Sequence, residues 1–331
     1  MHEFRRNDYD VTNTVQVSSP TAVSQAVRAL FMETWPGDSF ESLTVSFDDF
    51  AKLFTGRMPG YHGVDTVYHD RQHTLDVTLA AARLLAGYEK SAEPSLRLGA
   101  DRAKIGIVSA LFHDAGYIRE SDDLHSHNGA EFTLYHVTRS ARFLARYLQR
   151  IGMDSWIPVV TRLVHFTGYE LKTSQIQLAD ERDRKLGAIL GTADLIAQMA
   201  DRCYLEKCRD RLYPEFVLGG VAAATDSEGA LQVRYSSGVD LLRHTPEFVR
   251  ETRQQRLDGE FGQAYRYLEP LFGGKNPYIE AIDRNIGYLN TVLRGERWPM
   301  LRRKPPLFTA SKDPLPEVRG LMLDRLKSLW D

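Results

Sequence analysis

The sequence is poor in cysteine, which limits the kinds of site and of crosslink that the chain can build. Its 331 residues include two cysteines, Cys203 and Cys208. Two thiols cannot supply a disulfide framework or a four-thiolate zinc site. On a helix they would lie roughly 140° apart, so even a single disulfide is not expected. This use of cysteine indicates a reducing compartment.

Long apolar runs and an excess of one charge are also missing. No stretch approaches the ~20 apolar residues that cross a bilayer, and the segment from Met1 to Pro20 lacks the apolar core of a signal peptide. The chain has 42 Lys and Arg against 44 Asp and Glu, for a formal charge of −2, so it carries no general basic field for nucleic acid. We therefore expect a soluble, cytoplasmic protein with neither a membrane nor a nucleic acid as partner.

The residues that are abundant favour a helical fold with a large core. Apolar residues make up 43% of the chain and aromatic residues 10%, which argues against disorder. Apolar side chains recur at spacings of three and four, and no alternation of strands with helices is present, so a doubly wound sheet is not expected. We predict an all-α fold with one small β-hairpin near 230–237. The predicted helices cover 22–35, 47–54, 66–88, 100–113, 126–136, 140–151, 156–166, 182–218 with a break near Asp201 or Pro214, 246–257, 261–272, 277–293 and 316–330.

The composition divides the chain into three parts. Residues 1–60 are predicted to be an N-terminal helical extension, and residues 61–295 the main helical domain. Residues 296–331 contain the extended sequence Arg302-Arg303-Lys304-Pro305-Pro306, followed by an amphipathic helix. That last helix is expected to pack on the domain or on the partner subunit of a homodimer.

Histidines and aspartates that are typical of metal ligands occur in three separate helical segments. His69 and His73 are four residues apart in a run that reads as one helix, which Asp65 would cap, so their rings would share a face. His113 and Asp114 end an apolar helix, and Asp194 lies inside another apolar segment. A charge in an apolar helix is costly unless it is paired or bound to a cation. Together these side chains would form a mixed imidazole and carboxylate shell for a divalent metal.

Simpler interpretations exist for each motif on its own. A His-Asp dipeptide occurs by chance in many chains of this size, and a helical histidine pair is more often a core or surface feature than a pair of ligands. Asp194 could pair with Arg184 or Arg202 instead of a metal. The order in which the motifs occur, each on an apolar helix, favours the metal site.

This order of motifs resembles the HD superfamily of metal-dependent phosphohydrolases. The run Tyr68-His69-Asp70, with His73 and Asp76 following, closely resembles the opening signature of class I cyclic-nucleotide phosphodiesterases. The run Glu269-Pro270-Leu271-Phe272 is similar to that family's closing helices, so the resemblance spans roughly residues 65–293.

The resemblance implies an HD-domain or phosphodiesterase-like helical bundle and a site with two divalent ions, each of which is Mn, Fe, Zn, Co or Mg. His73, His113, Asp114 and Asp194 would ligate the first ion, and Asp114 would bridge to the second. A hydroxide held between the ions would attack phosphorus, and His69 would be the general acid.

The chain also departs from the phosphodiesterase pattern. Asp70 stands where that family has Asn, and Tyr117 stands where it has a further His. Gln263 is the nearest counterpart of the purine-binding Gln, but it lies about three residues too close to Pro270. Gln263 and Tyr68 are nevertheless the candidate substrate-binding residues.

Other elements resemble bacterial HD enzymes that have a fuller second metal site. The run from His125 to Glu131 is similar to their His-x-x-x-Gly-Ala element, and His165 lies in a run similar to the next histidine-bearing element. His125 and His165 are therefore candidate ligands of the second ion, with His127 as the alternative to His125. The candidate side chains that would orient the ligands are Asp70, Glu131 and His127, and Asp201 is either a further one or a solvated carboxylate. His2, His62, His136 and His244 lie in no motif and are expected to be structural or exposed.

Three functions follow from these patterns. The first is hydrolysis of a 3′,5′-cyclic nucleotide, which the His69 signature favours. The second is hydrolysis of a linear nucleotide, such as a nucleoside mono- or triphosphate or a dinucleoside polyphosphate, which the elements at His125 and His165 favour. The third is a sensor that binds metal or nucleotide without turnover.

Overall fold

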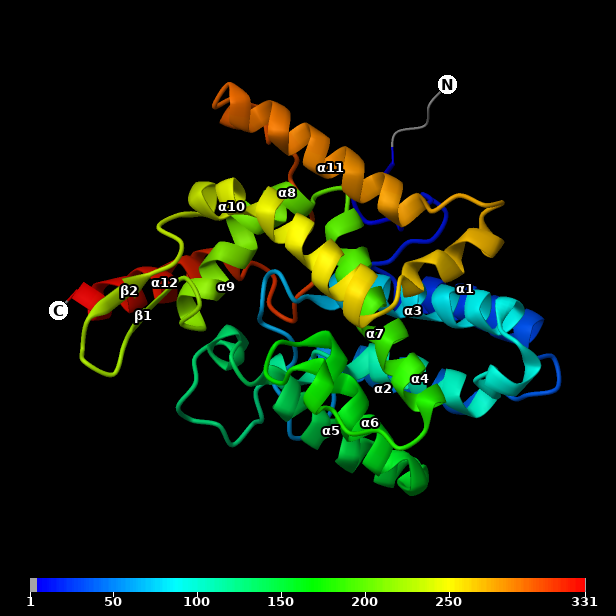
Figure 1. Ribbon diagram of the computed structural model, residues 1–331. Helices are drawn as coiled ribbons and strands as arrows, with labels where there is room; N and C mark the ends of the chain where they lie inside the picture. The colour runs from blue at the N-terminus through cyan, green and yellow to red at the C-terminus, as the bar shows by residue number, and fades with distance from the viewer. Residues whose placement is uncertain (1–4, 331) are drawn as a thin grey trace.

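The chain folds into helices, and its strands form one small hairpin (Figure 1). The computed structural model describes residues 5–330, so His2 lies outside the described residues. Strand β1 (Ala223–Thr225) pairs antiparallel with β2 (Leu231–Val233). The prediction of an all-α fold with a small hairpin is confirmed. Within the described range, no helix combines the length and the apolar character that crossing a membrane requires.

The long helices occupy most of the predicted ranges. Their bounds are α1 (Pro20–Thr34), α2 (Glu41–Phe54), α3 (Arg71–Ser91), α4 (Gly99–Phe112), α5 (His136–Arg150), α6 (Ile157–Leu163), α7 (Glu181–Ala200), α8 (Tyr204–Lys207), α9 (Tyr213–Leu218), α10 (Gly238–Glu251), α11 (Pro277–Arg294) and α12 (Leu315–Trp330). Shorter helical turns that bear on the site are η2 (Ala115–Tyr117), η3 (Gly129–Phe132), η5 (Val164–Thr167) and η7 (Cys208–Leu212).

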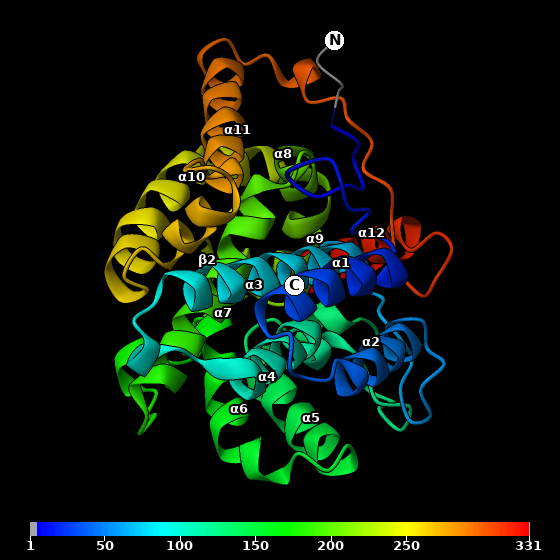
Figure 2. The ribbon, with the colours of Figure 1, turned by 90° about the vertical axis from the view of Figure 1, so that its right-hand side faces the viewer.

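Helix α3 lies at the centre of the fold, with α1, α4 and α7 packed against it (Figure 2). Every side chain of α3 from Gln72 to Tyr88 is buried. The carboxylate of Asp70 caps its N-terminus by accepting hydrogen bonds from the backbone N–H groups of Gln72 and His73. The predicted start at Thr66 was wrong because Asp70, and not Asp65, provides the cap.

Helix α7 ends at Ala200, so the predicted break near Asp201 is confirmed. Two glycines on α7 allow η5 to approach it closely. A Cβ at Gly187 would lie 2.6 Å from the ring of Phe166, and one at Gly191 would lie 2.5 Å from the carbonyl oxygen of Phe166. This close packing fixes the turn of α7 that carries Asp194.

The helix predicted over 126–136 is absent, and a loop with the single turn η3 takes its place. The Asn128 side chain accepts a hydrogen bond from the N–H of Ala130, and the Glu131 carboxylate accepts from the N–H groups of His127 and Asn128. These local bonds satisfy the backbone without a continuous helix. Helix α5 therefore begins only at His136.

The main hydrophobic core draws on residues from Val11 to Leu301. The predicted N-terminal part, 1–60, and the predicted main part, 61–295, share this core. A second, small cluster joins Val67, Ala130, Leu218 and Val318, and so brings the C-terminal helix α12 against the loop that precedes α3.

Candidate metal site

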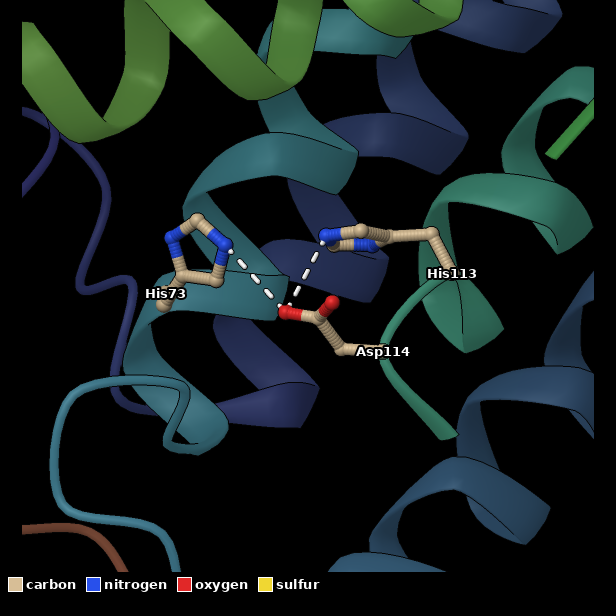
Figure 3. Close-up of side chains that lie close together, drawn as sticks. All are labelled: His73, His113 and Asp114. Carbon is tan, nitrogen blue, oxygen red and sulfur yellow. Dashed lines mark ion pairs between the residues drawn. The ribbon is translucent and has the colours of Figure 1, made fainter. Parts of the chain in front are cut away.

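Side chains from α3 and from the end of α4 meet beside the first turn of α3 (Figure 3). His73 Nε2 lies 3.3 Å from Asp114 Oδ2, and His113 Nε2 lies 3.2 Å from the same oxygen. The ligand atoms of these three residues all lie within 4.8 Å of one another. Asp194 adds a carboxylate oxygen 3.4 Å from His73 Nε2. The four residues that the sequence nominated for the first metal are thus brought together.

Several atoms of this cluster lack the partners that a buried polar group needs. His113 is 1% exposed and Asp114 3% exposed. Among the described residues, His113 Nε2 and Asp114 Oδ2 have no hydrogen-bond partner. The ring of His113 is oriented by a bond of 2.8 Å from Nδ1–H to the carbonyl oxygen of Ala110, which leaves the Nε2 lone pair directed at the cluster. Buried groups of this kind that lack partners fit a divalent cation.

The charges around the site show how strongly it attracts a positive charge. Burial alone would lower the pKa of His73, but the nearby carboxylates of Asp114 and Asp194 outweigh burial and raise that pKa to about 10. Burial likewise opposes the ionised form of Asp114, yet the imidazoles of His113 and His73 hold its pKa well below its usual range. In the absence of a cation, a proton on an imidazole therefore balances these carboxylates.

Asp194 does not engage the arginines that offered a simpler explanation for it. Among the described residues no ion pair joins it to Arg184 or Arg202, and its carboxylate lies instead beside His73 and His113. Asp201, by contrast, pairs with Lys207 at 2.6 Å and accepts a hydrogen bond from the N–H of Cys203. Asp201 therefore stabilises the end of α7 and the segment that follows it, and it does not contact the metal cluster.

His69 lies beside the cluster but outside the helix in which the sequence predicted it. It precedes α3, and its ring centroid is 5.7 Å from that of His73. Its Nδ1 lies 2.6 Å from Oε2 of Glu215, a carboxylate on α9 that is fully buried. The other carboxylate oxygen of Glu215 accepts the backbone N–H of Tyr68 at 2.5 Å. Glu215 thus fixes both the His69 ring and the backbone before it.

A stack of three rings lines one side of the site. Tyr117 lies between His69 and His136, with centroid distances of 4.4 Å and 4.3 Å. His136 Nε2 is 3.8 Å from Asp114 Oδ1, and its Nδ1–H bonds to the carbonyl oxygen of Thr133 at 2.7 Å. Burial lowers the pKa of His136, which favours the neutral ring that a metal requires.

The remaining sequence candidates have other surroundings. His125 and His127 are exposed in the loop before η3, and no ion pair among the described residues joins either of them to the cluster, whereas His136 lies beside Asp114. The ligand role given to His125 stays a prediction. Local bonding of that loop directs the chain along the surface until α5 begins. Gln263 is exposed, with a left-handed backbone (φ 58°), and among the described residues no side-chain hydrogen bond joins it to the cluster.

The residues nominated to orient the ligands act on the backbone instead. Asp70 caps α3, and Glu131 holds the turn before η3. Tyr68 packs against the rings of His69 and His73, and its hydroxyl donates to Gln198 at 3.2 Å. It therefore remains a candidate for contact with a substrate.

His165 lies on η5, and its Nδ1 is buried without a hydrogen-bond partner among the described residues. Burial lowers its pKa. The ion pairs of Asp114 and Asp194 among the described residues are with His73, His113 and His136, so the nomination of His165 as a ligand stays a prediction.

Two residues of the site, Glu215 and His136, were missed from the sequence. Glu215 follows Pro214 in an otherwise apolar run, which is the same signal that singled out Asp194. His136 had no comparable signal. Its position depends on Gly116, because a Cβ there would overlap with the carbonyl oxygen of His136 and push α5 away from Asp114.

No protein-family model matches the chain, and a search of curated proteins finds no significant match.

Proposed function

We propose that this protein is a metal-dependent phosphohydrolase, with a 3′,5′-cyclic nucleotide as the leading substrate class. One observation carries the proposal: a buried cluster with partnerless ligand atoms lies next to a histidine that a buried carboxylate orients. The buried cluster fits a cation, and the oriented histidine, His69, fits a proton donor. Their adjacency is what cleavage of a phosphoester with a basic leaving group requires.

The chain's own residues would hold the cation and move the proton. His73, His113, Asp114 and Asp194 would be the ligands, and a bound divalent ion would supply Lewis-acid stabilisation of charge at phosphorus. Glu215 accepts the Nδ1–H of His69, so His69 Nε2 remains free to exchange a proton. A protonated His69 would give that proton to the departing alkoxide of the ribose ester.

Two ions are supported by the second oxygen of Asp114. Its Oδ2 faces His73 and His113, whereas its Oδ1 faces His136. A carboxylate with an imidazole at each oxygen is suited to bridge two cations about 3.5–4 Å apart. His136 would then be a ligand of the second ion. The donor set of nitrogen and oxygen admits Mn, Fe, Zn, Co or Mg.

The same observation favours a second candidate function. A histidine on the second ion is the feature that the sequence associated with bacterial HD enzymes acting on linear nucleotides. Nucleoside mono- and triphosphates and dinucleoside polyphosphates therefore remain the alternative substrates. A sensor that binds metal or nucleotide without turnover is the third reading, and the complete ligand cluster argues against it.

A turnover panel tests these alternatives. Purified protein with added Mn²⁺ would be offered 3′,5′-cyclic nucleotides, nucleoside mono- and triphosphates, dinucleoside polyphosphates and bis(p-nitrophenyl) phosphate. We expect release of a 5′-nucleotide from a cyclic one, and a loss of about 10²–10⁴-fold in His69→Ala with metal binding retained. His244→Ala is the matched control, because His244 is exposed and far from these contacts.

Other results of the turnover panel would favour the alternative functions. Release of phosphate or pyrophosphate from linear nucleotides, without cleavage of cyclic ones, would favour the second function. Metal-dependent binding of a nucleotide without product would favour the sensor. An unchanged cyclic-nucleotide rate in His69→Ala would contradict the role given to His69.

A further inference from the structure

The C-terminal segment 305–330, here called the strap, is bound to the loop that carries His69. The backbone N–H of Phe308 donates to Asp70 Oδ2 at 3.3 Å. The N–H of Ala310 donates to the carbonyl oxygen of Val64 at 2.8 Å. These bonds attach the strap to the loop on both sides of His69 in the sequence.

A buried arginine joins the strap to the same loop from the other direction. Arg211 on η7 is 3% exposed. Its Nη2 donates to the carbonyl oxygens of Pro305 and Pro306 in the strap. Its Nη1 donates to the carbonyl oxygen of Val67 at 3.5 Å and lies 3.8 Å from Asp70 Oδ2. One guanidinium thus binds the strap and the two ends of the His69 turn.

Helix α12, the last part of the strap, packs beside α9 (Figure 1). Val318 of α12 is 1% exposed and contacts a cluster that contains Val67 and Leu218. Leu218 lies on α9 three residues after Glu215, and Val67 lies two residues before His69. The cluster therefore packs against both segments whose side chains form the bond between Glu215 and His69.

We propose that the strap is a positioning element for the His69–Glu215 pair, with Arg211 and Val318 as its positioning residues. Arg211 and Glu215 are four residues apart on consecutive helical turns, so they hold the His69 loop from one side. The strap closes the other side. His69 has no helix of its own to fix its backbone, because α3 starts only after it. Its orientation therefore depends on these contacts, whereas His73 and Asp194 lie within helices α3 and α7.

Full-length variants of Val318 test the strap. Val318→Asp places a charge in the cluster, Val318→Ile keeps it apolar, and Leu323→Asp makes the same change at a site on α12 that is 53% exposed. Hydrogen exchange reports the bond between the Tyr68 N–H and Glu215 directly. We expect exchange at residues 66–70 to become about tenfold faster in Val318→Asp and to stay unchanged in the other two, with α4 unaffected in all three. Titration with Mn²⁺ should give the same affinity throughout.

The catalytic consequence rests on the proposed function and has its own measurement. A p-nitrophenolate leaves without being protonated, whereas a ribose alkoxide needs the acid. In Val318→Asp we expect cyclic-nucleotide turnover to fall about tenfold while bis(p-nitrophenyl) phosphate is cleaved at the wild-type rate. Arg211→Met should show the same split if Val318→Asp does not fold.

The two proposals fail in different ways. Unchanged hydrogen exchange at residues 66–70 in both Val318→Asp and Arg211→Met would contradict the positioning role of the strap, whatever the wild type hydrolyses. An equal loss on both substrates, or a loss of Mn²⁺ affinity, would also overturn it, because the effect would then be general. A wild-type protein without phosphoesterase activity would contradict the proposed function. The hydrogen-exchange result would still test whether the strap positions the His69 loop.

Discussion

Metal binding at this site should compete with a proton on His73. Asp114 and Asp194 outweigh burial and raise the pKa of His73 to about 10, so at neutral pH the ring is protonated in the metal-free protein. A cation that binds His73 Nε2 must displace that proton. At pH 7 the competition weakens the affinity about a thousandfold relative to the deprotonated ring, since the two values differ by about three pH units.

The assay is calorimetric titration with Mn²⁺ between pH 6 and pH 8, in buffers with different heats of ionisation. We expect the dissociation constant to fall at least about tenfold per pH unit, and at least about one proton to be released per ion. Asp194→Asn removes one of the two charges that raise the pKa of His73, so it should release fewer protons as well as bind more weakly. An affinity that is constant over this range, with no proton release, would refute the reasoning.

The same proton has a consequence for stability. A folded-state pKa above the unfolded value of 6.5 gives stability that is fully present below pH 6.5 and is lost as the pH rises towards 10. In EDTA, urea unfolding should therefore give a free energy about 2 kcal/mol lower at pH 8.5 than at pH 6.5. Added Mn²⁺ should reduce this loss. A flat or rising profile in EDTA would contradict the charge balance described for the site.

The remaining predictions concern the proton donor, the packing of α7 and the ion pair of Asp10 near the N-terminus. Glu215→Gln should lower cyclic-nucleotide turnover by about 10²-fold with Mn²⁺ affinity retained, because the amide no longer stabilises a protonated His69; a wild-type rate would exclude that role. Gly191→Ala should lower the free energy of unfolding by about 1–3 kcal/mol, because its Cβ would lie 2.5 Å from a carbonyl oxygen of η5. Gly287→Ala is the control, since its Cβ meets nothing within 4 Å and should be neutral or slightly stabilising in thermal unfolding. Burial opposes ionisation of Asp10, but its ion pair with Arg83 and its hydrogen bonds lower its pKa to about 2. The contribution of Asp10 to the free energy of unfolding should therefore be present above pH 3.8 and be lost as the pH falls through 2. Asp10→Asn should flatten that part of an acid unfolding curve.

Local patterns in the sequence were enough to nominate the four side chains that meet in the buried cluster. His73, His113, Asp114 and Asp194 each lie in a strongly apolar helical run, where a polar group needs a reason to be buried. Apolar periodicity also located most of the long helices, and the break after α7. These features depend on spacing within a few residues, which the sequence displays directly.

The features that were missed depend on contacts between distant segments. Glu215 meets His69 across 146 residues, and no local spacing brings them together. His125 was nominated because it lies in a local motif, and His136 was expected to be structural or exposed because it lies in none. The place of His136 beside Asp114 depends on the close approach of η2 and α5 at Gly116. The start of α3 was misplaced because Asp65 and Asp70 are both suitable caps. Hydrogen bonding by Asp70 to the first turn decides between them.

The most direct test of the central claim is the metal content of the purified protein after incubation with Mn²⁺ and exhaustive dialysis. Wild-type protein and His244→Ala should each retain at least one ion per chain, whereas His113→Ala and Asp114→Asn should retain almost none, with wild-type helical content by circular dichroism. Retention of the full metal content by His113→Ala and Asp114→Asn would contradict the claim that this cluster holds a divalent cation.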